Sequence, residues 1–200
     1  MTDSGKCIVL ASASQVRARL LREAGVVFDI EPAHVDEAEV KLGMQTNPVE
    51  AVAESLAILK AQHISRRFPG AFVIGADQML EYGGGRLDKP ANLDQARAQL
   101  ISLRGCAHDL VGCTVVVKEG ARLWHHIGRV TLEMRPFSEA FLDSYLAAVG
   151  DEALQSVGAY QLEGRGAQLF SHVKGDYFSI LGLPLLPLLD FLRSCEALDR

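Results

Sequence analysis

The chain has 200 residues, of which 48% are hydrophobic and 22% charged, values typical of one soluble globular domain with a sizeable core. Its formal net charge of −5 argues against a non-specific binder of nucleic acid or of an anionic membrane, which would normally be basic. A small phosphorylated ligand remains compatible with this charge, because a local basic cluster is enough to hold it.

The cysteines indicate a reducing compartment. Cys7, Cys106, Cys113 and Cys195 form no C-x-x-C pair, and no Cys/His cluster has zinc spacing. We therefore expect buried free thiols. No secretory signal pattern precedes Cys7, and the most apolar stretch, 180–189, is too short to span a bilayer. The expected location is the cytoplasm.

The connection between the first predicted strand and the first predicted helix is a candidate anion-binding site. An apolar run at 6–11 predicts a buried strand, and a helix over 14–24 follows, with a weaker strand at 26–30. Ser12 and Ser14 lie where the strand ends and the helix begins, and backbone N–H groups at a helix start favour an anion. A plain N-cap role for Ser14 is the simpler interpretation, and the two functions are compatible.

A second helix is predicted over 47–68, with Asn47 as its cap and Pro48 at its first position. Lys60 interrupts the apolar stripe of this helix. One reading is that its stem lies along the apolar surface while its ammonium reaches water. The other is that it binds phosphate together with further basic residues.

The next strand is predicted over 71–76 and to end at Asp77. In an α/β sheet, ligands usually bind outside the carboxyl ends of strands, so an acidic residue there is a candidate site residue. A glycine turn at 82–86 and the pair Lys89-Pro90 follow.

The second half of the chain predicts a mixed α/β order with an antiparallel pair near the middle. No repeat or linker divides the sequence, so we expect a single domain over 1–200 whose two lobes share one core. The expected elements are a helix over 92–103, a hairpin of strands 107–118 and 123–134, a helix over 138–149, a glycine-rich turn after residue 160, and a helix over 184–193.

Two acidic patches and three basic residues suggest phosphate chemistry. The acidic patches are Asp36-Glu37 and Asp77; the basic residues are Arg17, Lys60 and Lys89. Carboxylates bind a hard divalent cation, and Lys and Arg bind phosphate oxygens. No Walker motif, G-x-G-x-x-G or G-x-S-x-G is present, which argues against the usual nucleotide folds and against an α/β-hydrolase.

Taken in order, these segments resemble the Maf family of nucleoside triphosphate pyrophosphatases, and the match covers nearly the whole chain. The matching stretches are 10–17, 20–21, 36–37, 59–61, 74–78, 88–90, 158–164, 175–177 and 182–184. The resemblance implies a cytoplasmic enzyme, often a homodimer, that cleaves a nucleoside triphosphate to the monophosphate and pyrophosphate with Mg or Mn. It also implies an elongated, mixed and twisted α/β sheet with helices on both sides and a cleft between two lobes, similar to inosine triphosphate pyrophosphatases.

The resemblance also assigns roles to individual residues. Asp77 is similar to the catalytic carboxylate that activates water, and it would contribute to the metal site; Glu37 is similar to a metal or water ligand. The other implied residues are Lys60 and Lys89 as catalytic cations on the phosphates, and Ser12, Ser14 and Arg17 as phosphate ligands. This fits an in-line attack on the α-phosphate in which cations stabilise the leaving pyrophosphate.

Substrate-binding residues for the base are implied at Gln78 and Glu163. Both resemble the subgroup that acts on 7-methyl-GTP, and a carboxylate suits the cationic methylated guanine. The segment 158–160 instead resembles the subgroup acting on dTTP and UTP, and Gln15-Val16-Arg17 keeps only the last residue of the frequent Pro-Arg-Arg. We therefore expect 7-methyl-GTP as the leading substrate, with dTTP or UTP as the alternative.

Two other classes of function remain as alternatives. One is a nucleotide-binding regulator of cell division without turnover, which the complete set of acidic and basic residues disfavours. The other is a phosphatase acting on monophosphates. We expect neither a nucleic-acid nor a membrane partner.

Overall fold

A computed structural model describes residues 7–199 of the chain, which fold into two compact units. Unit 1 comprises the residues up to Gln78, Gly112–Gly128 and those from Gly182 on; unit 2 comprises Met79–Val111 and Arg129–Leu181. The described strands form one seven-stranded sheet in the order β2-β1-β3-β5-β6-β7, with β4 paired to β3. The strands are β1 Ile8–Leu10, β2 Asp29–Ile30, β3 Phe72–Tyr82, β4 Gly85–Leu87, β5 Ala107–Lys118, β6 Ala121–Met134 and β7 Phe170–Lys174.

The helices are interspersed with these strands along the chain, in a mixed α/β order. The α-helices are α1 Gln15–Glu23, α2 Glu37–Gly43, α3 Val49–Ser65, α4 Leu93–Leu103, α5 Glu139–Val149, α6 Tyr177–Ile180 and α7 Leu185–Ser194. Short 3-10 segments lie at η1 Gly150–Gln155, η2 Val157–Ala159 and η3 Arg165–Leu169. No helix within residues 7–199 is both long and apolar enough to cross a membrane.

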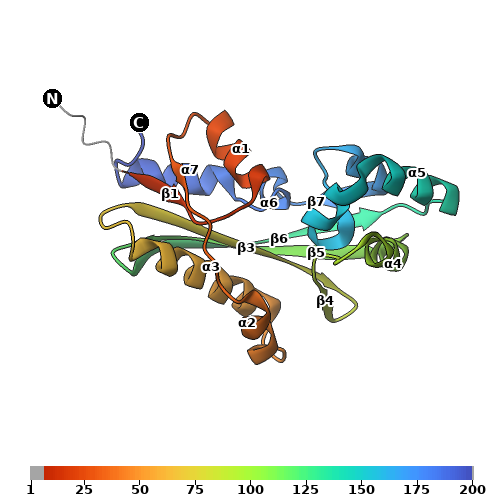
Figure 1. Ribbon diagram of the computed structural model, residues 1–200. Helices are drawn as coiled ribbons and strands as arrows, with labels where there is room; N and C mark the ends of the chain where they lie inside the picture. Colours follow the sequence, from red (N-terminus) through yellow and green to blue (C-terminus); the bar gives the residue numbers. More distant parts are fainter. Residues whose placement is uncertain (1–6, 200) are drawn as a thin grey trace. The chain divides into compact units, whose positions relative to one another are not determined.

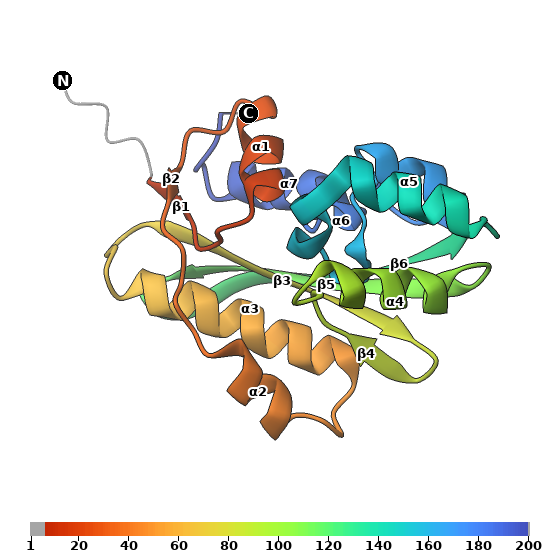
Figure 2. The same ribbon diagram turned by 45° about the vertical axis from the view of Figure 1, so that its right-hand side comes forward.

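In unit 1, β1 is a parallel neighbour of both β2 and β3, and Val9 pairs with Val73 in the register. Figures 1 and 2 show α3 on one face of this part of the sheet and α1 and α7 on the other. Strands covered on both faces are apolar throughout, and β1 and the first residues of β3 are fully buried.

In unit 2, the last residues of β3 pair antiparallel with β4, and β6 pairs antiparallel with β7. Helices α4 and α5 contact one another and pack with the 3-10 segments η1 and η2. The buried core of this unit joins strand residues such as Leu80 and Leu132 to helix residues such as Leu100 and Leu142.

The predicted mixed α/β architecture with a twisted sheet is confirmed, and so are most of its elements. The hairpin of β5 and β6 turns at Glu119 and Gly120, both of which have positive φ, as a tight hairpin turn requires. Asn92 and Ser138 cap α4 and α5 through their side chains, as expected. The single domain with two lobes and the cleft between them remain predictions.

Several local predictions were wrong. Strand β3 does not end at Asp77 but continues to Tyr82, because Met79 and Leu80 are buried and the strand then pairs with β4. The cap of α3 is Pro48 without a side-chain hydrogen bond, so Asn47 does not cap it.

Other boundaries also differ from the sequence-based expectation. Helices α2 and α6 were not predicted, and the strand expected over 26–30 is reduced to β2. The first residue of the strand expected over 6–11 lies outside the described residues. All the cysteines are free, as expected, but Cys7 is exposed and only Cys113 is buried.

Candidate active site

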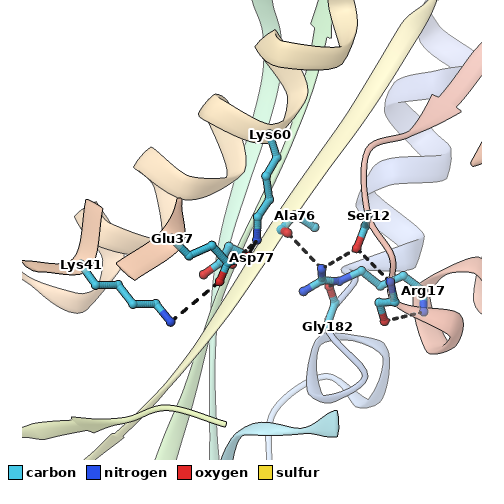
Figure 3. Close-up of polar contacts among 9 residues, drawn as sticks. Ser12, Arg17, Glu37, Lys41, Lys60, Ala76, Asp77 and Gly182 are labelled. Carbon is cyan, nitrogen blue, oxygen red and sulfur yellow. Dashed lines mark hydrogen bonds and ion pairs between the residues drawn. The ribbon is translucent and has the colours of Figure 1, made fainter. Parts of the chain in front are cut away.

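An ion-paired group, here named the Lys60 cluster, joins Glu37, Lys60 and Asp77 in unit 1 (Figure 3). The Lys60 ammonium lies 2.7 Å from Asp77 Oδ1 and 2.7 Å from Glu37 Oε1. The side chains of Lys60 and Asp77 are only 10% and 8% exposed, whereas Glu37 is 44% exposed. Lys60 therefore neutralises one buried and one accessible carboxylate, and the reading in which its ammonium reaches water is wrong.

Gly75 explains how α3 comes close enough to β3 for this contact. A Cβ atom at Gly75 would lie 2.3 Å from the carbonyl oxygen of Ala57 and 2.7 Å from Cβ of Ala61, so no side chain fits there. Alternate residues of a strand share a face, so Asp77 points to the same side as Gly75. Lys60 lies one helical turn from Ala57, and the close approach brings its ammonium to the Asp77 carboxylate.

Burial and charge act in opposite directions on Asp77. Burial disfavours its carboxylate and raises its pKa, and nearby Glu37 adds to this effect, whereas Lys60 and Arg17 lower it. The net pKa of Asp77 lies above the ordinary value. A carboxylate whose pKa is moved toward neutrality is better matched to accepting and returning a proton near pH 7.

One oxygen of Asp77 is uncommitted. Asp77 Oδ2 is fully buried and has no hydrogen-bond partner among residues 7–199. A buried carboxylate oxygen without a partner is costly, so it is suited to a water molecule or a cation. Within the same described residues, no group of three or more His, Cys, Asp or Glu side chains could hold a metal ion.

A second group, the Arg17 cluster, is built at the start of α1. Figure 3 shows it on the other side of β3 from the Lys60 cluster. Ser14 caps α1 by accepting a hydrogen bond from the backbone N–H of Arg17, which confirms its N-cap role. The Arg17 guanidinium donates from Nη1 to Ser12 Oγ at 3.0 Å and to the Ala76 carbonyl at 2.9 Å, and from Nε to the Gly182 carbonyl at 2.8 Å.

All three acceptors of Arg17 are neutral oxygens. Its Nη2 donates to no residue in the part of the chain that the structure describes. Burial lowers the pKa of Arg17, while Asp77 and Glu37 oppose this effect, and a guanidinium remains charged regardless. The result is an oriented cation whose position is fixed by the main chain and which retains donor capacity for an anion.

The other predicted site residues are distributed over both units. Gln78 follows Asp77 in β3 and is half-buried. Lys89 is exposed in the segment between β4 and α4, and Glu163 lies half-buried in the turn between η2 and η3. These last two residues belong to unit 2, and their roles remain predictions.

The sequence reading missed three contributors to these clusters. Lys41 lies 3.8 Å from Glu37 Oε2 at the i,i+4 position, which could have been recognised had α2 been predicted. The carbonyls of Ala76 and Gly182 orient Arg17, and main-chain acceptors leave no residue-type signal in a sequence.

The chain is similar to known proteins over nearly its whole length. The chain is 54% identical over 187 residues to a "Nucleoside triphosphate pyrophosphatase" of Paramagnetospirillum magneticum, covering 92% of this chain and 96% of that protein. It is 44% identical over 194 residues to a "7-methyl-GTP pyrophosphatase" of Rhizobium etli, covering 96% and 98%. A HAM1 protein structure from Coxiella burnetii is 19% identical with a TM-score of 0.41 over 64% of this chain and 73% of that one, which is too weak to support an inference.

The relatives at 54% and 44% identity are matched over nearly their full length. A family model described as "Maf-like protein" matches residues 7–195, which is almost the whole described chain. The chain belongs to the Maf-like protein family.

Proposed function

We propose that this protein is a nucleoside triphosphate pyrophosphatase, which hydrolyses its substrate to the nucleoside monophosphate and pyrophosphate. The observation that supports this most directly is the Lys60 cluster, in which the buried Asp77 keeps Oδ2 uncommitted beside an ammonium group. The names of the relatives in the same family agree with this chemistry.

In the proposed reaction, a water molecule attacks the α-phosphorus and transfers a proton to Asp77. The bond between the α-phosphorus and its bridging oxygen then breaks, and pyrophosphate leaves with the electron pair of that bond. The pKa of Asp77, raised by burial, suits this role as general base. We infer that Arg17 binds phosphate oxygens through Nη2, since its other donors are taken by Ser12, Ala76 and Gly182. The family resemblance implies the same role for Lys89.

A divalent cation, Mg or Mn, is the proposed cofactor. Asp77 and Glu37 would hold it, and this donor set fits, because magnesium sites commonly use one or two carboxylates together with substrate phosphates. Asp77 Oδ2 supports this proposal, because it is buried and has no hydrogen-bond partner among the described residues. When bound, such an ion would neutralise charge on the phosphates.

We propose 7-methyl-GTP as the leading substrate and dTTP or UTP as the alternative. Glu163 supports the first choice, because its carboxylate can accept hydrogen bonds from a guanine and attracts the positive charge of the methylated base. Relatives of 44% and 46% identity in Rhizobium etli and Mesorhizobium japonicum have "7-methyl-GTP pyrophosphatase" as their name.

We further propose that the protein is a cytoplasmic homodimer without nucleic-acid or membrane partners. The acidic net charge and the free cysteines support this environment. Light scattering of the purified protein would measure the oligomeric state, and a monomer at micromolar concentration would contradict the dimer.

The decisive experiment measures pyrophosphate release with Mg or Mn from 7-methyl-GTP, UTP, dTTP, CTP, ITP and GTP. We expect release with a strong preference for 7-methyl-GTP. A preference for UTP, dTTP or CTP would keep the enzyme class and reject the base assignment. Binding without any product would favour the regulator, and release of orthophosphate in place of pyrophosphate would indicate another phosphatase.

The Glu163→Gln variant tests the base assignment directly, because it removes the charge while nearly keeping the shape. We expect the ratio of kcat/KM for 7-methyl-GTP over UTP to fall about tenfold, since a hydrogen bond to a charged group contributes roughly 1.5–3 kcal/mol. Unchanged selectivity in this variant would reject the role of Glu163.

A further inference from the structure

Gly182 lies next to the Arg17 guanidinium and forms a hydrogen bond with it. Its carbonyl oxygen accepts the hydrogen bond from Arg17 Nε at 2.8 Å, so it fixes the direction of the guanidinium plane. Its backbone has a φ of +88°, a conformation that glycine adopts readily and other residues rarely do. In Figure 3, Gly182 lies beside the Arg17 guanidinium at the end of the Arg17 cluster.

The surroundings of Gly182 leave little room for a side chain. A Cβ atom there would lie 3.1 Å from Arg17 Nε, 3.2 Å from Arg17 Nη2 and 3.5 Å from Gln78 Oε1. The first two distances are shorter than an ordinary van der Waals contact, so the guanidinium would have to move. The atoms it would press against include Nη2, the nitrogen that donates to no described residue.

The position of Arg17 depends on such contacts because no carboxylate among the described residues accepts a hydrogen bond from it. Its three hydrogen-bond acceptors are two main-chain carbonyls and the Ser12 hydroxyl. Neutral acceptors orient the guanidinium without neutralising its charge, so the cation remains available to an anionic ligand. Displacing the guanidinium by a few tenths of an ångström would change where Nη2 points.

We propose that Gly182 is a positioning residue that aims Arg17 Nη2 at a phosphate group of the substrate. This inference rests on the proposed function, and it adds a residue that touches no substrate itself. The Gly182 carbonyl orients the guanidinium through its hydrogen bond, and the absence of a side chain at Gly182 leaves room for it. A side chain at position 182 then weakens phosphate binding through Arg17.

The test compares Gly182→Ala with the matched control Gly25→Ala. Gly25 has a similar φ of +74° and nothing within 4 Å of its Cβ position, so alanine there meets backbone strain alone. The inhibition constant of inorganic pyrophosphate and the KM of the triphosphate are measured for both variants. We expect Gly182→Ala to raise both constants roughly tenfold, the loss of one hydrogen bond to a charged group, and Gly25→Ala to change them less than about twofold.

A double-mutant cycle separates positioning from general damage. In the Arg17→Met background, Gly182→Ala has nothing left to misplace, so we expect it to change the pyrophosphate inhibition constant less than about twofold. The same tenfold effect in both backgrounds would overturn the inference, as would equal effects of Gly182→Ala and Gly25→Ala. A wild-type protein that neither turns over triphosphates nor binds pyrophosphate would overturn the proposed function first.

A measurement on the wild type covers the case in which Gly182→Ala does not fold. Nitrogen-15 NMR of the Arg17 Nε–H group reports whether the guanidinium is held before ligand arrives. We expect a signal that exchanges slowly with water and has low mobility in the absence of ligand. A mobile, rapidly exchanging Nε–H that becomes ordered only with pyrophosphate would contradict positioning by Gly182.

Discussion

Asp77 in unit 1 and His108 in unit 2 are both buried polar residues with one unsatisfied atom. Asp77 Oδ2 and His108 Nδ1 have no hydrogen-bond partner among the described residues. Asp77 is 6% exposed and His108 is 3% exposed. The partner of Asp77 is the Lys60 ammonium, whereas His108 Nε2 forms a hydrogen bond of 2.7 Å with the Tyr160 hydroxyl. The same structural signal therefore occurs in a charged and in a neutral setting.

The two residues differ in the charged groups that oppose the effect of burial on their pKa values. At His108, burial lowers the pKa to about 4, and only Asp109 opposes it, so the imidazole is neutral at physiological pH. Burial also raises the pKa of Tyr160, which keeps its hydroxyl protonated. At Asp77, two cations favour the charged form against burial. The two unsatisfied atoms thus differ in setting: two cations favour the charged form of Asp77, whereas His108 has only the carboxylate of Asp109 to favour its charged form and is neutral.

The largest expected effect concerns Asp77. The Asp77→Asn variant removes the proton acceptor and nearly keeps the shape, so we expect kcat to fall by at least about 100-fold, the range of general acid–base catalysis. The measurement is pyrophosphate release at saturating substrate, with circular dichroism to verify the fold. A folded variant that retains full activity would show that Asp77 is not the base.

The next largest effect concerns the stability of the Lys60 cluster. The Lys60→Met variant leaves the Asp77 carboxylate buried without its cation, and breaking a buried ion pair in this way costs about 4 kcal/mol. Without Lys60 the pKa of Asp77 rises further in the folded state. Stability is then retained below the unfolded pKa and lost as pH rises through the folded one.

Urea unfolding of Lys60→Met at about pH 5 and about pH 8 checks this sign. The free energy of unfolding is expected to be lower at the higher pH, relative to the wild type. The control is Lys41→Met, since Lys41 lies 3.8 Å from the accessible Glu37 and this partly exposed pair contributes under about 1 kcal/mol. Equal losses in the two variants would contradict the buried role of Lys60.

The sequence revealed the first of these regions far better than the second. Lys60 interrupts an apolar stripe and Asp77 follows an apolar run, so each is a charged residue in an apolar segment and can be recognised within a short stretch of sequence. The buried position of His108 is harder to recognise, because the residue lies in a predicted strand and its partner Tyr160 lies 52 residues further on.

The errors in the fold prediction have different causes. Strand β3 continues past Asp77 into a local hairpin with β4, in which Leu80 faces Leu87 and Tyr82 faces Gly85. The sequence predicted the glycine turn at 82–86 but not the strand pairing on either side of it. Helix α2 is only seven residues long, although Asp36 caps it by accepting from the Glu39 N–H, a spacing that predicts a helix start. The orientation of Arg17 could not be predicted, because its acceptors include carbonyls distant in sequence.

The buried His108 imidazole is expected to make the free energy of unfolding depend on pH. Its folded pKa is depressed below the ordinary 6.5, so its contribution is complete above the unfolded pKa and is lost as pH falls toward about 4. This difference corresponds to about 3 kcal/mol. We expect urea unfolding to show a larger loss between about pH 7 and about pH 4.5 in the wild type than in His108→Gln. Parallel losses in the two proteins would contradict a buried neutral imidazole.

The smallest expected effect comes from Tyr160→Phe. This variant removes the hydroxyl that pairs with His108 Nε2 and leaves a second buried nitrogen without a partner, which costs about 1–2 kcal/mol. The ring contact with Phe170, with centroids 4.8 Å apart, is preserved. We expect a lower free energy of unfolding and a kcat within about twofold of the wild type.

Combining Tyr160→Phe with His108→Leu makes this contrast decisive. Replacing both partners by apolar groups removes the unsatisfied nitrogen, so the double variant is expected to recover part of the stability that Tyr160→Phe loses. The corresponding double variant at Lys60 and Asp77 recovers stability by the same argument but remains inactive. If Tyr160→Phe folds normally yet loses turnover, the His108–Tyr160 pair has a catalytic role and the distinction between the two regions fails.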